Sequence, residues 1–123
     1  MKLKEVIEYV DELKPNAFSS ETKTRWINAL EGRIQTEVML FGPDNITTYT
    51  WEDDQDTELF VRPPYEEIYE DYLYARIDLA NGEYDKYADS MAKFEEIFTA
   101  FTIWYIEEYH PADIPCGREV RTC

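Results

Sequence analysis

The sequence is poor in the residues from which most small active sites are built. It has a single histidine, His110, which stands beside Pro111 at the end of a predicted helix and favours a structural role over that of a general base. Its four glycines are isolated from one another, so no glycine-rich phosphate-binding loop is present. No serine–histidine–aspartate arrangement stands out either. We therefore predict no catalytic residue and no enzyme activity.

Cysteine is scarce as well. Both cysteines, Cys116 and Cys123, lie in a polar stretch at the C-terminus. Two cysteines and one histidine are too few ligands for a structural zinc site, so we predict neither a metal nor a cofactor. The first interpretation is two free, reduced thiols, and the alternative is a disulfide that closes the tail or links two subunits.

Long apolar runs are missing. No stretch approaches the roughly 20 apolar residues that a membrane-spanning helix needs. Residues 1–14 carry scattered charges and lack the continuous apolar region of a signal peptide. The sequence thus predicts no membrane association and synthesis in the cytoplasm.

Basic residues are few: 12 lysines and arginines stand against 27 aspartates and glutamates, which gives a net charge of −15. This balance argues against nucleic-acid binding by phosphate neutralisation and favours basic protein partners or a surface that repels DNA. The negative charge is concentrated in the middle and the second half of the chain. Residues 1–42 and the last thirteen residues are nearly balanced.

What the sequence has in abundance is helical periodicity. Apolar residues at 3–4-residue spacing predict helices over residues 3–14, 21–40, 63–80 and 83–110, with Ser19 or Ser20 capping the second and Asn81-Gly82 ending the third. Pro111 is expected to end the last helix. Two β-prone runs, 46–51 and 59–61, predict a loose hairpin between the second and third helices. Gly32, inside the second helix, suggests close approach of another backbone.

The predicted fold class is mainly α. It is a four-helix bundle-like domain over residues 1–110, with an extended or hairpin segment between helices 2 and 3, and residues 111–123 form a flexible tail. Two rows of aromatic and apolar residues recur every seven positions along the last helix and indicate packing against an antiparallel helix. These rows are Tyr84, Met91, Phe98 and Tyr105, and Tyr87, Phe94 and Phe101.

Residues 63–109 hold 8 of the 10 tyrosines and 12 of the 27 carboxylates, beside only three basic side chains. Surplus aromatic surface of this kind, together with an acidic loop that precedes it, is typical of protein interfaces. We therefore predict an interaction surface with the following members: Trp51, Glu52, Asp53, Asp54, Asp56, Glu58, Phe60 and Trp104.

The acidic loop invites a test for calcium. Asp54, Asp56 and Glu58 alternate like the first ligands of an EF-hand, but Leu59 occupies the glycine position and Tyr65 the closing glutamate position. A solvated loop or a contact for a basic partner is the first interpretation. A divalent-cation site of another type is the alternative.

Four stretches carry a resemblance to a known family: LKPN (13–16), ETKTRWINALEGRIQTEV (21–38), DTELFVRPPYEEIY (56–69) and YLYARIDLANGEYDKYADSMAKF (72–94). With these stretches, residues 1–110 resemble the small head–tail connector, or head-completion adaptor, proteins of tailed phages and prophages of Gram-positive bacteria. The Trp26-containing helix and the helical hairpin at 75–94 carry the resemblance most specifically.

The resemblance implies a mostly helical, non-enzymatic protein that forms a ring between portal and tail around a DNA channel. Its expected partners are the portal protein, other connector or tail proteins and further copies of itself, although the isolated protein can remain a monomer. The expected location is the neck of the virion, after synthesis in the host cytoplasm. From the charge alone, the competing hypothesis is an acidic DNA mimic that inhibits a nucleic-acid-binding enzyme. A small enzyme is a third, less supported hypothesis.

Overall fold

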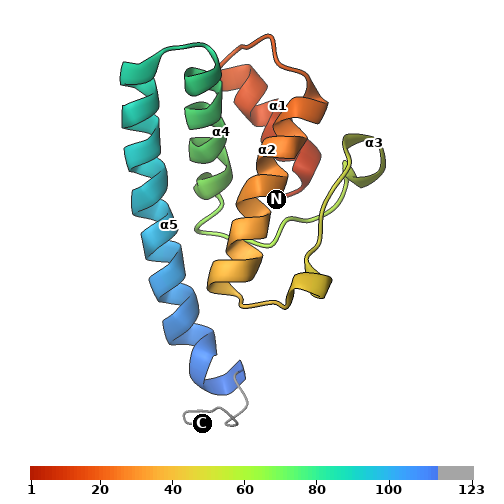
Figure 1. Ribbon diagram of the computed structural model, residues 1–123, viewed down its shortest axis with the longest axis vertical. Coiled ribbons are helices and arrows are strands. Elements are labelled where there is room, and N and C mark those ends of the chain that lie inside the picture. Colours follow the sequence, from red (N-terminus) through yellow and green to blue (C-terminus); the bar gives the residue numbers. More distant parts are fainter. Residues whose placement is uncertain (114–123) are drawn as a thin grey trace.

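The computed structural model describes the backbone of residues 1–113 and the side chains of residues 1–108, and this part of the chain is mainly helical (Figure 1). Four longer α-helices are joined by shorter helical turns. In chain order the elements are α1 (Leu3–Leu13), α2 (Ser20–Arg33), a π-helical turn η1 (Ile34–Val38), a 3-10 turn η2 (Pro43–Asn45), α3 (Trp51–Asp54), α4 (Glu67–Ala80) and α5 (Tyr84–Asp113).

The first helix begins and ends close to where the sequence places it, and the second helix begins close to its predicted start. The Ser19 hydroxyl accepts a hydrogen bond from the Thr22 N–H, which satisfies one free donor of the first turn of α2. Lys23 on α2 is buried, but its ammonium pairs with Asp11 of α1 and with the Asn16 side chain. These contacts tie the α1–α2 connection to both helices, because a buried charge is tolerated only when it is paired.

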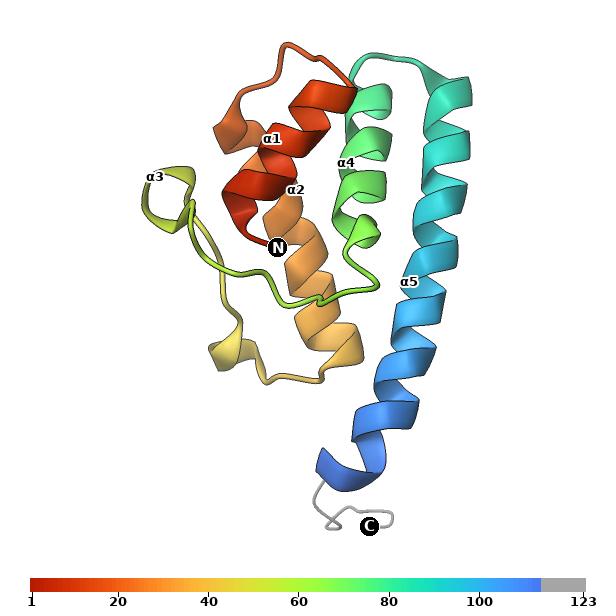
Figure 2. The same ribbon diagram turned by 180° about the vertical axis from the view of Figure 1, so that it is seen from behind.

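Helices α4 and α5 form the antiparallel hairpin that the sequence predicts (Figures 1 and 2). Gly82 has φ +75°, the left-handed conformation that ends a helix without steric cost only at glycine. The buried Asp78 carboxylate supports this turn. Its Oδ1 lies 2.7 Å from Lys14 Nζ at an angle outside that of a hydrogen bond, and its Oδ2 accepts from Ser90 Oγ.

A single apolar core lies between α1, α2, α4 and the first two-thirds of α5. On α1, Leu3, Val6, Ile7 and Val10 are buried, whereas Leu13 is 55% exposed. On α5, Phe94, Phe98 and Phe101 are buried, while Tyr84 is 68% exposed because it lies at the turn end of the helix. The seven-residue rows thus describe the middle of α5 correctly and overestimate the burial of its N-terminal end.

Two expectations about the second helix are wrong. The predicted helix 21–40 is interrupted, since α2 passes into the π-turn η1 after Arg33. The helical run then ends at Val38, and two residues later Leu40 has a left-handed backbone conformation, with φ +60°. Nothing outside the helix approaches within 4 Å of a Cβ placed at Gly32, so this glycine does not mark close backbone contact. Phe41, which follows this helical run, is exposed and packs edge-on against Phe60.

The predicted hairpin between the second and third helices does not form. Within residues 1–113 there is no strand, and an isolated antiparallel bridge joins Lys2 to Glu58. Instead, residues 46–61, here called the strap, run along the side of α2 that faces away from α5, with α3 in the middle (Figures 1 and 2). A two-stranded hairpin is marginal by itself, and contacts to α2 replace the pairing between its strands.

The last helix continues to Asp113, so Pro111 does not end it. Residues 114–123 lie outside the described part of the chain. The predicted flexible tail, apart from its first three residues, and the two cysteines therefore also lie outside it.

Candidate functional site

Two side-chain amides, Asn28 of α2 and Gln35 of the adjoining turn η1, hold the strap by its backbone. Asn28 accepts from the Tyr49 N–H and donates to the Tyr49 carbonyl, both at 2.8 Å. Gln35, two turns further along the helix, accepts from the Thr47 N–H at 2.7 Å and donates to the Thr47 carbonyl at 3.0 Å. Each amide thus forms two hydrogen bonds with the backbone of one strap residue, as a residue of a neighbouring β-strand would. This side of the helix takes the place of a sheet edge.

A buried carboxylate lies between these two amides. Glu31 is fully buried and accepts hydrogen bonds from the Tyr49 hydroxyl at 2.8 Å, the Tyr69 hydroxyl at 2.7 Å and the Phe60 N–H at 3.2 Å. The Tyr69 hydroxyl in turn accepts from the Val61 N–H at 2.7 Å. One side chain of α2 therefore fixes both ends of the strap and the first turn of α4.

Burial raises the pKa of the Glu31 carboxyl, although the hydrogen bonds from Tyr69, Tyr49 and Phe60 act in the opposite sense. Burial beside Glu31 also raises the pKa values of the Tyr49 and Tyr69 hydroxyls. Both tyrosines therefore stay protonated and remain donors, as the network requires. Because Glu31 is fully buried and bonded to both ends of the strap, the geometry of the cluster is that of a structural clamp.

The strap also covers the beginning of α1. The first N–H groups of a helix have no partner within the helix. Here the Leu3 N–H donates to the Thr57 carbonyl at 3.1 Å and the Lys4 N–H to the Gln55 carbonyl at 2.9 Å. The strap backbone thus satisfies two of these N–H groups, beside the Lys2 N–H that donates to the Glu5 side chain.

The predicted interface residues of the strap fall into two groups. Three carboxylates are engaged within the chain: Asp54 accepts from the Thr50 N–H, Asp56 lies 3.8 Å from the Lys4 ammonium, and Glu58 lies 2.9 Å from the Met1 amine. Glu52 and Asp53 are exposed on α3 and form no salt bridge within the described residues.

The aromatic members of the predicted interface serve packing. Trp51 is half-buried against the core, and the half-buried Phe60 packs against Phe41 at 5.9 Å between ring centroids. Trp104 is also half-buried and lies 5.4 Å from the Tyr65 ring. The structure therefore does not gather the eight predicted residues into one patch: seven lie on the strap, and Trp104 lies on α5.

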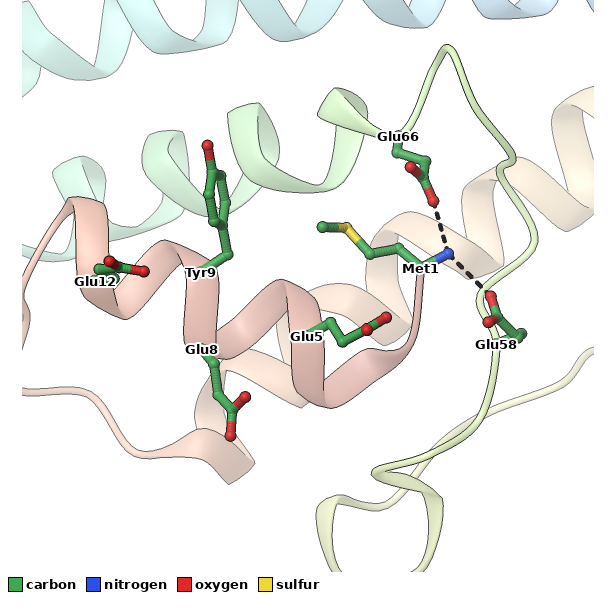
Figure 3. A pocket seen from close by; sticks show the side chains of 7 residues that line it. All are labelled: Met1, Glu5, Glu8, Tyr9, Glu12, Glu58 and Glu66. Atoms are coloured by element: carbon green, nitrogen blue, oxygen red, sulfur yellow. Dashed lines mark hydrogen bonds and ion pairs between the residues drawn. The ribbon is translucent and has the colours of Figure 1, made fainter.

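An acidic groove runs along α1 on the side near the start of α4 (Figure 3). It is an open depression of about 610 Å³ with this lining: Met1, Glu5, Glu8, Tyr9, Glu12, Glu58 and Glu66. Figure 3 shows Tyr9 pointing from α1 toward α4 and the Met1 amine between the carboxylates of Glu58 and Glu66, to which it is paired at 2.9 and 2.7 Å. Because five of the seven lining side chains are carboxylates, the groove suits cationic groups.

The negative charge continues onto α4. Burial, together with the neighbouring Glu67, Asp71 and Glu66, raises the pKa of Glu70 to about 7. Burial and Glu67 also raise the pKa of Asp71. Burial, Glu70, Tyr9 and other acidic neighbours raise the pKa of Tyr74 to about 12. These carboxylates repel one another, and Lys93 offsets the repulsion only in part, at Asp71.

Replacing Glu70 with glutamine is therefore expected to stabilise the protein above neutral pH. A raised pKa means that the folded state holds the proton more tightly, so this group's contribution to stability is present at acidic pH and is lost as the pH rises through about 7. The expected gain at pH 8 is about 1 kcal/mol, well below the full value of the shift because water still screens the partly exposed Glu70.

Urea unfolding of both proteins at pH 5 and pH 8 measures this effect. The Glu12→Gln variant, altered on the exposed face of α1, controls for the loss of one negative charge. An equal stability difference between Glu70→Gln and the parent protein at both pH values would contradict the predicted repulsion.

A second exposed surface lies on α5. With 30 residues, α5 is more than twice as long as the 14-residue α4 against which it packs. At 1.5 Å per residue the two helices are about 45 and 21 Å long, so much of α5 extends past its partner. Figures 1 and 2 show this part continuing beyond the ends of α2 and α4. It presents Ile103 and Ile106, which are 53% and 48% exposed.

The sequence analysis did not identify the clamp on α2 or the isoleucine pair on α5. A signal for the clamp exists, because Glu31 and Gln35 fall within the same helical stripe as the buried Ile27, Ile34 and Val38. A polar residue at a core position needs a buried partner. The exposure of Ile103 and Ile106 has no such signal, since it depends on where α4 begins relative to α5.

No group of three or more histidine, cysteine, aspartate or glutamate side chains in the described part of the chain is placed to hold a metal ion. Among the same residues, no helix has both the length and the apolar composition needed to cross a lipid bilayer.

No protein-family model matches this chain, and comparisons with curated proteins and with solved structures found no match either.

Proposed function

We propose that this chain is a structural head–tail connector protein of a tailed phage or prophage. In this proposal it assembles between portal and tail around the DNA channel, in the virion neck, after synthesis in the host cytoplasm. Its partners are the portal protein, other connector or tail proteins and further copies of itself. In this proposal the helical domain around α4 and α5 carries, on its outside, the surfaces that contact these partners.

The main support is the part of α5 that extends beyond α4. A helix end with two isoleucines about half exposed is costly for an isolated protein, because apolar surface gains free energy when it leaves water. Since the extension reaches past the other helices, it can contact a neighbouring subunit without disturbing the domain that carries it. The acidic groove adds weaker support, because carboxylates facing a channel would repel DNA phosphates and let the duplex slide.

The Ile103→Asp, Ile106→Asp double variant is expected to weaken binding to the portal ring at least tenfold. Two carboxylates at a buried interface leave uncompensated charges, which cost more than the lost apolar contact. The measurement is co-sedimentation with the portal protein encoded in the same gene cluster, with circular dichroism to verify folding.

The Ala88→Asp, Ala92→Asp double variant provides the matched control. It adds the same charge to exposed positions of the same helix, but in the part that lies alongside α4. Its binding should equal that of the parent protein. The connector proposal is wrong if the parent protein does not bind the portal protein. The assignment of the interface to the α5 extension is wrong if both double variants bind the portal protein like the parent.

A DNA-mimic inhibitor is the second candidate. Glu5, Glu8 and Glu12 lie along one side of α1 and line the acidic groove. At 1.5 Å of rise per residue they are spaced by about 4.5 and 6 Å along the helix, a row of negative charges on the scale of a phosphate backbone. An equimolar dose should then inhibit a restriction or repair nuclease, and Glu8→Gln should relieve that inhibition. Full nuclease activity at equimolar dose would exclude this candidate for the enzymes tested.

A further inference from the structure

The first part of the strap behaves as a β-strand with one edge occupied. Ile46 and Thr50, at its two ends, have extended backbone angles (φ −81°, ψ 124° and φ −115°, ψ 145°). Thr47 and Tyr49 direct their N–H and carbonyl groups to the amides of Gln35 and Asn28 on α2. In an extended chain, alternate residues direct their backbone groups to opposite edges. The backbone groups of Thr48, between them, therefore point away from α2.

This outer edge is open at Thr48, whereas at its end the Thr50 N–H donates to Asp54 Oδ2 and the Thr50 carbonyl accepts from the Asp54 N–H. Among the described residues, neither the N–H nor the carbonyl of Thr48 takes part in a hydrogen bond, and the Thr48 side chain is exposed. A strand edge with unpaired backbone groups is a template on which another extended chain can add as a further strand. The run Ile46-Thr-Thr-Tyr-Thr50 is also rich in the β-branched and aromatic residues that favour such pairing.

The charges beside the edge select the kind of chain that fits. Exposed carboxylates lie at both ends, Asp44 before the strand and Glu52 and Asp53 after it. A second copy of the same strand would bring the same carboxylates against them, and like charges across a strand pair are destabilising. A chain with lysine or arginine near its ends would instead gain attraction and faster association.

We propose that the outer edge of residues 46–50 is a docking site for an extended, basic peptide segment of a partner protein, which adds as a strand beside Thr48. Asn28 and Gln35 act as positioning residues, because they hold the edge in its extended form from behind. The docking site does not depend on which assembly the chain joins. It can therefore be tested separately from the connector proposal.

Two proline variants at neighbouring positions separate docking from folding. Thr48→Pro removes the outward N–H donor and leaves both amide pairs with α2 intact, and the extended conformation before a proline suits Thr47. Thr47→Pro removes the donor to Gln35 instead. Thr48→Pro should therefore unfold at the same urea concentration as the parent protein, whereas Thr47→Pro should unfold at a lower one.

The probe is the synthetic peptide KVKVTVKV, with EVEVTVEV as its charge-reversed control. The basic peptide should bind saturably, and at saturation it should slow hydrogen exchange of the Thr48 amide at least tenfold. Thr48→Pro should weaken its binding at least tenfold, as measured by fluorescence anisotropy. The Glu52→Gln, Asp53→Asn double variant should weaken it severalfold and reduce its salt dependence.

Three results would overturn the docking site. The first is a Thr48 amide that is already protected from exchange in the free protein, because the edge would then be occupied. The second is equal binding of the two peptides or no binding of either. The third is unchanged binding to Thr48→Pro. Because the probe is synthetic, none of these results bears on the portal experiment.

Discussion

Replacing Glu31 with alanine is expected to lower the free energy of unfolding by about 3–5 kcal/mol, a large fraction of the stability of a domain of this size. The substitution leaves three buried donors without an acceptor: the Tyr49 hydroxyl, the Tyr69 hydroxyl and the Phe60 N–H. Each unsatisfied buried donor costs about 1–3 kcal/mol, and the three costs overlap because the structure relaxes around them. The strap should lose its fixed position together with the first turn of α4.

Urea unfolding followed by circular dichroism measures this loss, and hydrogen exchange of the Phe60 and Val61 amides reports on the strap directly. Glu37→Ala is the matched control, since Glu37 lies on the next part of the same helical run but is exposed and pairs only with Arg33, at 3.2 Å. Its expected cost is about 0.5 kcal/mol or less. A loss below about 1 kcal/mol for Glu31→Ala would show that the clamp is not needed for stability.

The pH dependence of the same site follows from the direction of its pKa shift. Burial raises the Glu31 pKa, so the folded state favours the neutral carboxyl, and this stabilising contribution is lost as the pH rises through the raised pKa. Glutamine keeps one acceptor oxygen and cannot ionise. We therefore expect the stability of the parent protein to fall relative to Glu31→Gln between pH 4 and pH 7. A constant stability difference between the two proteins across this range would contradict the predicted rise in the Glu31 pKa. It would mean that the hydrogen bonds to the Glu31 carboxylate offset the cost of its burial.

The sequence predicts the four long helices because their apolar residues recur at helical spacing and their ends carry the expected capping residues. Ser19 and Gly82 occupy the predicted capping positions. The position of the last helix end was wrong, because a proline was taken as a stop whereas α5 continues to Asp113. Two features near the end of α2 are not predicted by the spacing of apolar residues. They are the π-turn η1 and the left-handed conformation of Leu40.

The strap shows why a correct local preference led to a wrong motif. Residues 46–50 are extended, as their β-branched residues indicate, but the partner of this extended chain is a helix. Pairing by the amides of Asn28 and Gln35 depends on tertiary placement, which local propensity does not contain. Two of the acidic residues between the two runs, Asp54 and Glu58, are engaged within the chain, and their role in an interface stays a prediction.

The interface prediction on the last helix stays a prediction. The sequence places Trp104 in the predicted interaction surface because aromatic residues are in surplus. In the structure Trp104 packs beside Tyr65, and Ile103 and Ile106 are the exposed residues. Their exposure is set by the length difference between α4 and α5, a property of the assembled hairpin.

Replacing Phe94 with alanine is the second change with a large expected effect, a loss of about 3–5 kcal/mol in the free energy of unfolding. Phe94 is fully buried in the seam between α4 and α5, with ring centroids 5.1 Å from Tyr72 and 5.5 Å from Phe98. Alanine removes both aromatic contacts and leaves a cavity that the packed helices can fill only in part. Thermal and urea unfolding measure the loss.

Lys93→Ala, at the exposed neighbouring position, is the control and should change stability by about 0.5 kcal/mol or less. The Phe94 variant also separates the domain from its proposed interface. Phe94 lies where α5 is covered by α4, whereas Ile103 and Ile106 lie on the extension. If the extension binds a partner as proposed, the folded fraction of Phe94→Ala should bind the portal with the affinity of the parent protein, while the isoleucine variant stays folded and does not bind. A Phe94 variant that stays folded but loses binding would mean that the partner contacts the covered part of α5, and the interface would have to be moved there.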